Sequence, residues 1–129
     1  MSDSLTLIKE HVVPGLRTRG FKGSFPHFRR ITNSAVHLLT FQLDKWGSGD
    51  FVAEIAKAPL GPVSVSWGNP IPSNKLTAHD LDVRLRLGAS TPAADHWFKY
   101  ADVSADPSGF STQFFNLVDT HGNRWWDGA

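Results

Sequence analysis

The sequence predicts an α+β fold, in which an antiparallel β-sheet meander carries an N-terminal helix on one face and a short helix follows near the C-terminus. Three observations support it: an apolar stripe with helical spacing at the start, three apolar runs that alternate in β fashion between positions 24 and 56, and a fourth such run at 80–87. A chain of 129 residues suffices for one core, so we expect a single domain over 1–129.

The N-terminal stripe predicts a helix over roughly residues 4–18, with one apolar face formed by Leu5, Ile8, Val12 and Leu16. Ser4 is placed to cap its start, and Gly20 suits the left-handed position past its end. Pro14 removes a backbone donor and clashes with the preceding turn, so we expect a kink there.

The next three runs predict the meander. We expect strands at 24–31, 35–45 and 51–56, separated by turns at 32–34 and 46–50. Because side chains alternate along a strand, one face of the middle strand should carry His37, Leu39, Phe41 and Leu43. The opposite faces of the second and third strands should be partly polar.

Residues 57–78 contain four prolines and little periodicity, which predicts a long loop with a short edge strand at 63–67. The run at 80–87 is the clearest strand pattern in the chain. We expect its apolar residues in the core, covered with the rest of the sheet by the N-terminal helix: Leu81, Val83, Leu85 and Leu87. Its other face carries Arg84 and Arg86.

The C-terminal region admits two interpretations. Asp106-Pro107 is typical of a helix start, and the helix would carry Phe110, Phe114 and Leu117. Alternatively, 114–119 and 124–126 would form a hairpin around 121–123. We favour the helix.

Composition excludes several classes of function. Thirteen Lys and Arg against twelve Asp and Glu give a net charge of +1, so we expect no attraction to nucleic acid or to a membrane surface. The absence of cysteine excludes disulfides, thiolate nucleophiles and Cys-based metal sites. Neither a signal-peptide pattern nor a long apolar run is present, so we expect a soluble cytoplasmic protein.

No cofactor is expected either. The six histidines lack the i, i+4 spacing that places two ligands on one helix face, and the chain has no P-loop, G-x-G-x-x-G or G-x-S-x-G motif. His37 lies on an apolar strand face and is interpreted as a hydrogen-bonded core histidine. His79 and His96 are interpreted as polar residues at loop ends.

The candidate site is the polar sheet face. Pairing the second and third strands about Ser48 places Gln42 opposite Glu54, and Arg84 or Arg86 could join them from the 80–87 strand. Such a charged surface could bind a polar ligand or a partner's side chain. A solvated sheet face without a binding role would have the same residue pattern.

Tryptophans offer a second candidate surface. Trp67 lies in the long loop, and the pair Trp125-Trp126 is suited either to an interface or to packing of the tail on the body.

Several short motifs resemble a bacterial family, number four-three-zero-four in the series of domains of unknown function. They are the segments 8–16 and 19–22, the tripeptide Thr40-Phe41-Gln42, the basic strand 84–88 and the Asp-x-Trp-aromatic segment 95–98, in that order. The resemblance spans roughly residues 5–100. It implies a small α+β fold that tolerates Pro14, and it brings no established activity.

Two functions follow from these features. The first is a non-enzymatic binding or interaction module that uses Gln42, Glu54 and Arg84, or Trp67, against a protein or a small polar ligand; an immunity-like partner of a bacterial toxin is one version. The alternative is a small hydrolase or lyase in which Glu54 acts as a base beside Arg84 or Arg86, with His37 or His96 nearby. A deep pocket holding Glu54 and an arginine would favour the enzyme.

Overall fold

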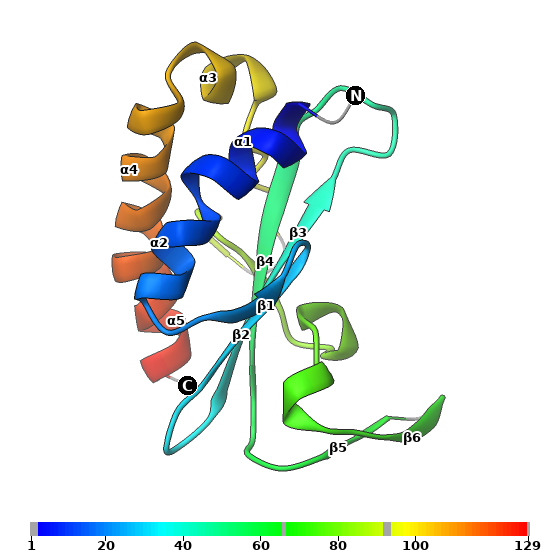
Figure 1. The fold of residues 1–129 in the computed structure, drawn as a ribbon. Helices are drawn as coiled ribbons and strands as arrows, with labels where there is room; N and C mark the ends of the chain where they lie inside the picture. The colour runs from blue at the N-terminus through cyan, green and yellow to red at the C-terminus, as the bar shows by residue number, and fades with distance from the viewer. Residues whose placement is uncertain (1–2, 66, 92–93, 129) are drawn as a thin grey trace.

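The computed structural model describes residues 3–65, 67–91 and 94–128 and confirms the α+β fold (Figure 1). Its helices are α1 (Asp3–His11), α2 (Val13–Thr18), α3 (Tyr100–Ala105), α4 (Pro107–Leu117) and α5 (Asn123–Gly128), with a π-helical turn at Val118–Gly122 between the last two. Its strands are β1 (Lys22–Ser24), β2 (His27–Ile31), β3 (Val36–Leu43), β4 (Phe51–Ala58), β5 (Val63–Val65), β6 (Gly68–Ile71) and β7 (Leu85–Arg86).

Five antiparallel strands form the main sheet in the order β1-β2-β3-β4-β7. The helices lie together on one side of this sheet (Figure 1). Between them and the sheet lies the larger core cluster, which is rich in aromatic residues and includes Phe21, Phe28, Leu39, Phe41, Phe51, Ile55, Leu85, Leu87, Phe98, Phe110, Phe114 and Trp126. The helix-covered face of the sheet is therefore buried in the main core.

The other face of the sheet, here the helix-free face, is covered at one end by the segment that follows β4. Two 3-10 turns of that segment, Ser73–Lys75 and Ala78–Asp80, flank Leu76, which packs with Ala78 in a second cluster. Small and aliphatic residues of β3 and β4 complete it: Val36, Leu38, Ala56 and Ala58. β5 and β6 form a separate two-stranded hairpin that extends away from the sheet (Figure 1).

The N-terminal helix is interrupted near Pro14, as expected. α1 ends at His11 and α2 begins at Val13, so Pro14 occupies the first turn of α2, where its missing N–H costs little. After α2, Gly20 has a φ of 91°, and the amides of Gly20 and Phe21 return to the carbonyls of Arg17 and Leu16. This is a Schellman ending, and it confirms the role given to Gly20.

The prediction for Ser4 is wrong. α1 begins at Asp3, and the Ser4 hydroxyl donates to the carbonyl of Gly49 instead of capping the helix. The bond fastens α1 to the β3–β4 loop.

The predicted strand at 24–31 is confirmed only at His27–Ile31, which is β2, because the chain reverses at Phe25-Pro26 and Ser24 belongs to β1 of the β1–β2 hairpin. β3 and β4 lie where their alternation placed them, but their register differs from the prediction by two residues. Thr40, rather than Gln42, pairs with Glu54. The hairpin is centred on Gly47, which has a φ of 82°, rather than on Ser48.

The run at 80–87 forms a strand only at Leu85–Arg86. Upstream, Asp80 accepts hydrogen bonds from the backbone amide and the hydroxyl of Thr77, which closes a 3-10 turn in place of a strand. Residues 81–84 follow this turn and are not in a strand; Val83 is 67% exposed, and Leu81 packs on the second cluster. Only two of the four predicted core residues of this run, Leu85 and Leu87, lie in the main core.

The C-terminal region is helical, so the hairpin interpretation is wrong. Asp106 caps α4 through its Oδ1, which accepts the amide of Gly109 at 3.0 Å, and Pro107 occupies the first turn. Phe110 and Phe114 pack into the core on the buried face of α4.

Candidate functional site

Glu54 lies near the middle of β4 and points to the helix-free face of the sheet. Its strand neighbours are Thr40 on β3 and Arg86 on β7. The residue is only 7% exposed, and a buried carboxylate requires compensating partners because water no longer solvates its charge.

Three cationic or hydrogen-bonding side chains surround this carboxylate. His79 Nε2 lies 3.0 Å and Arg84 Nη1 3.5 Å from Oε1, while Arg86 Nε lies 3.3 Å from Oε2. Both oxygens are therefore engaged. We call these four residues, Glu54, His79, Arg84 and Arg86, the Glu54 cluster.

The two arginines of the cluster differ in the number of groups that hold their side chains in place. Arg86 also reaches Asp95 Oδ1 at 3.1 Å, and its guanidinium lies 5.6 Å from the ring centre of Trp97, so several groups fix it in place. The side chain of Arg84 is 37% exposed, and its ion pair with Glu54 is long. Arg84 is thus anchored at one nitrogen and open to solvent elsewhere.

A second pair of polar residues, His27 and Thr40, adjoins the cluster. The Thr40 hydroxyl oxygen accepts the amide of Ala78 at 3.1 Å and lies 3.2 Å from His27 Nδ1. Because that oxygen already accepts one bond, its own hydrogen is free to be donated to Nδ1. Burial, followed by the charges of His79 and Arg29, lowers the pKa of His27 below 6.5, which favours neutral imidazole.

The structure brings together three of the residues singled out in the sequence, Glu54, Arg84 and Arg86. Gln42 shares their face but is exposed and pairs with Val52. Trp67 lies apart from them at the β5–β6 turn and is 66% exposed.

His79 is the member of the cluster that sequence reasoning missed. A signal existed in Thr77 and Asp80, whose spacing is that of a capping box. Recognising the resulting turn would have shown that His79 projects from a fixed position rather than from an irregular loop end.

His37 lies on the opposite, helix-covered face of the sheet. It is 6% exposed, stacks on Trp126 with ring centres 5.1 Å apart, and accepts a hydrogen bond from Arg30 Nε at 3.1 Å. Burial and the charge of Arg30 lower its pKa to about 4. The interpretation as a core histidine is confirmed, and its placement beside Glu54 in the enzyme hypothesis is wrong.

Trp126 is likewise structural. It is 1% exposed, and its indole N–H donates to the carbonyl of Ala56 at 3.0 Å. Of the two interpretations of the terminal tryptophans, packing on the body therefore holds for this residue.

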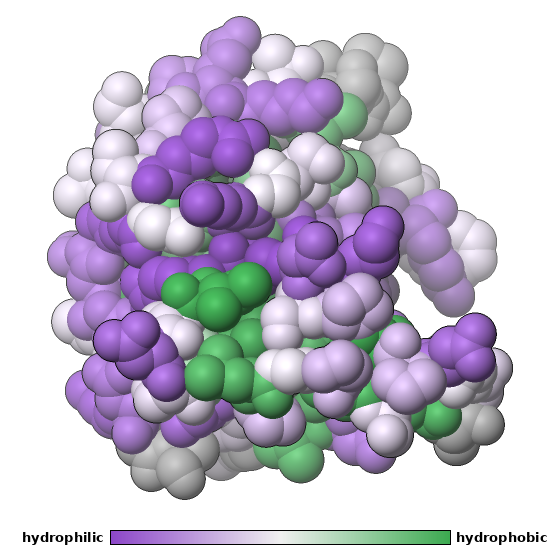
Figure 2. All heavy atoms as spheres, turned by 60° about the horizontal axis from the view of Figure 1, so that its bottom comes forward, coloured by the Kyte–Doolittle hydropathy of each residue, from purple (hydrophilic) through white to green (hydrophobic). Residues whose placement is uncertain are grey.

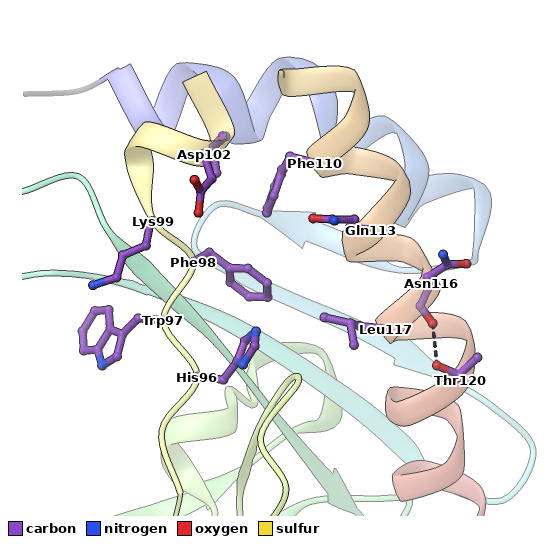
Figure 3. A pocket seen from close by; sticks show the side chains of 11 residues that line it. His96, Trp97, Phe98, Lys99, Asp102, Phe110, Gln113, Asn116, Leu117 and Thr120 are labelled. Carbon is purple, nitrogen blue, oxygen red and sulfur yellow. Dashed lines mark hydrogen bonds between the residues drawn. The ribbon is translucent and has the colours of Figure 1, made fainter. Parts of the chain in front are cut away.

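A hollow of about 470 Å³ lies between residues 96–103 and α4, on the helical side of the molecule (Figure 3). The rings of Phe98 and Phe110 and the side chain of Leu117 form its apolar wall, and His96 stands at one end. Asp102 and Gln113 point into it from opposite sides (Figure 3). Glu54 and the arginines of its cluster do not line this hollow, so it is not the deep pocket that the enzyme hypothesis requires.

Across residues 3–65, 67–91 and 94–128, no group of three or more His, Cys, Asp or Glu side chains is arranged to hold a metal ion. Within the same ranges, none of the helices combines the length and apolar character needed to cross a membrane.

A family model, described as a domain of unknown function, DUF4304, matches residues 12–128. The chain belongs to this family. The DUF4304 match begins later than the resemblance at 5–100 and extends further towards the C-terminus, where it includes α4 and α5. Neither a curated protein nor a solved structure matches the chain. Membership of DUF4304 thus supplies no activity, and function must be argued from the site itself.

Proposed function

We propose that this DUF4304 protein is a non-enzymatic binding module whose contact surface surrounds Arg84 on the helix-free face. The observation that carries the proposal is the anchoring of a partly exposed guanidinium by a buried carboxylate, that of Glu54. A binding residue held in place before its partner arrives loses less side-chain entropy on association.

Arg84 suits recognition of a carboxylate. A guanidinium offers five N–H donors in a planar fork that matches the two oxygens of a carboxylate. The ion pair with Glu54 involves one nitrogen of Arg84 at 3.5 Å, which leaves the outer donors accessible. The complementary group on a partner is therefore acidic.

One exposed apolar side chain is next to this cation in the sequence: Val83, directly before Arg84, is 67% exposed. Trp67, which is 66% exposed, lies apart from the Glu54 cluster on the β5–β6 hairpin that extends away from the sheet (Figure 1). Tryptophan and arginine are enriched among the residues that dominate protein interfaces. We infer a protein partner whose acidic side chain is flanked by apolar ones. An immunity-like protein that covers a toxin is one version of this proposal.

The hydrolase or lyase alternative receives less support from the same geometry. A general base needs an oxygen directed at the proton it removes. Both oxygens of Glu54 face cationic or hydrogen-bonding residues of the protein itself. Glu54 is therefore better suited to hold Arg84 than to accept a proton.

The proposal can be tested with three labelled peptides of equal length, in which leucine and phenylalanine alternate with glutamate, glutamine or lysine. Fluorescence anisotropy should show the acidic peptide binding at least about tenfold more tightly than the basic one. Arg84→Ala should weaken binding of the acidic peptide by about tenfold, since a hydrogen bond to a charged group contributes about 1.5–3 kcal/mol.

Arg124→Ala is the matched control, because Arg124 is an exposed arginine on α5, on the helical side. It should bind the acidic peptide as the unmodified protein does. Equal affinities of the Arg84→Ala and unmodified proteins, or equal binding of the acidic and basic peptides, would refute the proposed contact surface.

A further inference from the structure

Two cations face each other across the β1–β2 hairpin. Lys22 and Arg29 are directly paired in its register, so their side chains share one face of the sheet. Like charges in this arrangement repel each other and destabilise a hairpin. An arrangement that is unfavourable by itself becomes favourable when an anion lies between the two charges.

Both residues line the same cavity, which has a volume of about 320 Å³. The rest of its wall comes from Gly20, Gly23, Ile31 and Asn74. Small-molecule sites begin at about this volume. The cavity therefore accommodates a small ligand rather than a folded partner.

The charge of Arg29 is held in position at this cavity. Arg29 Nε donates to the carbonyl of Leu76 at 2.9 Å, which holds the guanidinium against the hairpin. Arg17 Nη2 donates to the carbonyl of Gly23 at 3.0 Å and brings a third cation to the same hairpin. In the part of the chain that the structure describes, none of these three residues forms an ion pair with an acidic side chain.

The charge of Asp80 acts on Arg29 and favours its protonated form, but the two side chains form no ion pair. The carboxylate of Asp80 is already used, since its Oδ2 accepts hydrogen bonds from Thr77. Lys22 is exposed. The charges that line the cavity are thus available to an external anion.

The cavity also has polar and apolar parts beside its charges. The carboxamide of Asn74 can donate to an oxygen atom, while Ile31, which is 53% exposed, provides an apolar lip. Figure 2 shows a hydrophobic area bordered by hydrophilic residues at the end of the molecule that lies at the bottom of Figure 1.

We propose that this cavity binds a small organic anion, with a phosphate or carboxylate group between Lys22 and Arg29 and an apolar portion over Ile31. The site is separate from the surface around Arg84 and does not depend on the proposed protein partner. Either anionic group satisfies the shared chemistry, and the experiment below distinguishes them.

The probes are inorganic phosphate, phenyl phosphate and benzoate, titrated into ¹⁵N-labelled protein at constant ionic strength set with sodium chloride. At least one probe should shift the amide resonances of residues 20–23 and 29–31 in a saturable manner. Tighter binding of phenyl phosphate than of benzoate identifies a phosphate site, and the reverse order identifies a carboxylate site. Phenyl phosphate should bind more tightly than inorganic phosphate because only the former covers Ile31.

Lys22→Gln should weaken the best probe at least tenfold, whereas Lys45→Gln, a change of an exposed lysine on the β3–β4 loop, should leave its affinity unchanged. Lys22→Glu gives a second readout that does not require a ligand. It replaces a repulsive pair with an attractive one, so it should raise the thermal midpoint of the free protein while abolishing binding of the anion.

Three outcomes would overturn the proposal. The first is that no probe produces saturable shifts at residues 20–23 and 29–31 at concentrations up to about 10 mM, because a dissociation constant above that value would mean that no specific site exists. The second is that the Lys22→Gln and Lys45→Gln proteins bind the best probe with equal affinity. The third is a lower thermal midpoint for Lys22→Glu than for the unmodified protein. Lys22 is exposed, so these variants should fold.

Discussion

Glu54 holds the helix-free face together at the scale of single residues. Its carboxylate lies within 3.5 Å of groups from three other residues, and its side chain is 9% exposed. Removing one partner from a buried ionic arrangement is costly because the remaining charges stay buried and uncompensated.

Glu54→Gln should therefore lower the free energy of unfolding by about 3 kcal/mol, since it removes the carboxylate that pairs with Arg84 and leaves Arg86 with Asp95 alone. Chemical denaturation would measure the loss. Glu10→Gln, at an exposed glutamate of α1, serves as the control and should change stability by less than about 0.5 kcal/mol. A similarly small effect at Glu54 would mean that the cluster contributes nothing to stability.

His37 should make stability depend on pH. Its pKa is about 4 in the folded protein against 6.5 ordinarily, because burial and the Arg30 charge disfavour the imidazolium. Since the folded pKa is depressed, the unfolded state binds the proton more readily. The contribution of neutral His37 to the free energy of unfolding is therefore complete above pH 6.5 and is lost as the pH falls towards 4.

The loss should be on the order of 2 kcal/mol between these pH values. Denaturation midpoints measured from pH 7 to pH 4 would show it as a downward slope. A His37→Gln variant lacks the titrating ring, so its slope should be shallower over the same range. Parallel slopes for the two proteins would assign the pH dependence to other groups.

At the scale of elements, the stability of α4 depends on the side-chain cap at its first turn. Asp106→Ala removes the side-chain acceptor of the Gly109 amide and should destabilise the protein by about 1 kcal/mol. Asp106→Asn retains an acceptor and should recover most of the loss, whereas Asp82→Ala, at an exposed loop aspartate, should have little effect. Thermal denaturation of the three variants provides the measurement, and equal midpoints for Asp106→Ala and Asp106→Asn would show that the cap is unimportant.

The same scale explains which elements could be predicted. Periodicity identified β3 and β4 because alternation along them reflects burial against the helices, and it identified α4 through Phe110 and Phe114. It failed over most of 80–87, where alternation was present but the bonds between Thr77 and Asp80 close a turn that ends at Asp80, and a strand forms only at Leu85–Arg86. Local hydrogen bonding by short polar side chains competes with strand formation, and it cannot be detected from the spacing of the apolar residues.

The candidate site was predictable in part for a related reason. Glu54 and Arg86 meet because their strands pair, and strand faces can be inferred from alternation. The two-residue error in the β3–β4 register preserved the face of Glu54, since side chains repeat every second residue. His79 comes from outside the sheet, and its approach depends on how residues 76–80 pack over β3 and β4, which no periodicity encodes.

At the scale of the whole molecule, the two faces of the sheet differ in what they offer. The helical face is filled by an aromatic core, whereas the helix-free face carries both the Glu54 cluster and the Lys22–Arg29 cavity. A net charge of +1 conceals this distribution, because acidic and basic residues balance over the chain as a whole. The charges on which the two proposals rest, those of Arg84, Lys22 and Arg29, all lie on the helix-free face.

The outer edge of β4 is closed by two short pairings that come from different parts of the chain. Leu87 donates its amide to the carbonyl of Ala53, and Phe51 and Phe98 exchange two backbone hydrogen bonds. An open edge of this length would display unpaired donors and acceptors on which a strand of another molecule could add. At the opposite edge, β1 has only three residues and carries Lys22, whose charge discourages such addition. Both margins of the sheet are thereby protected against edge-to-edge aggregation.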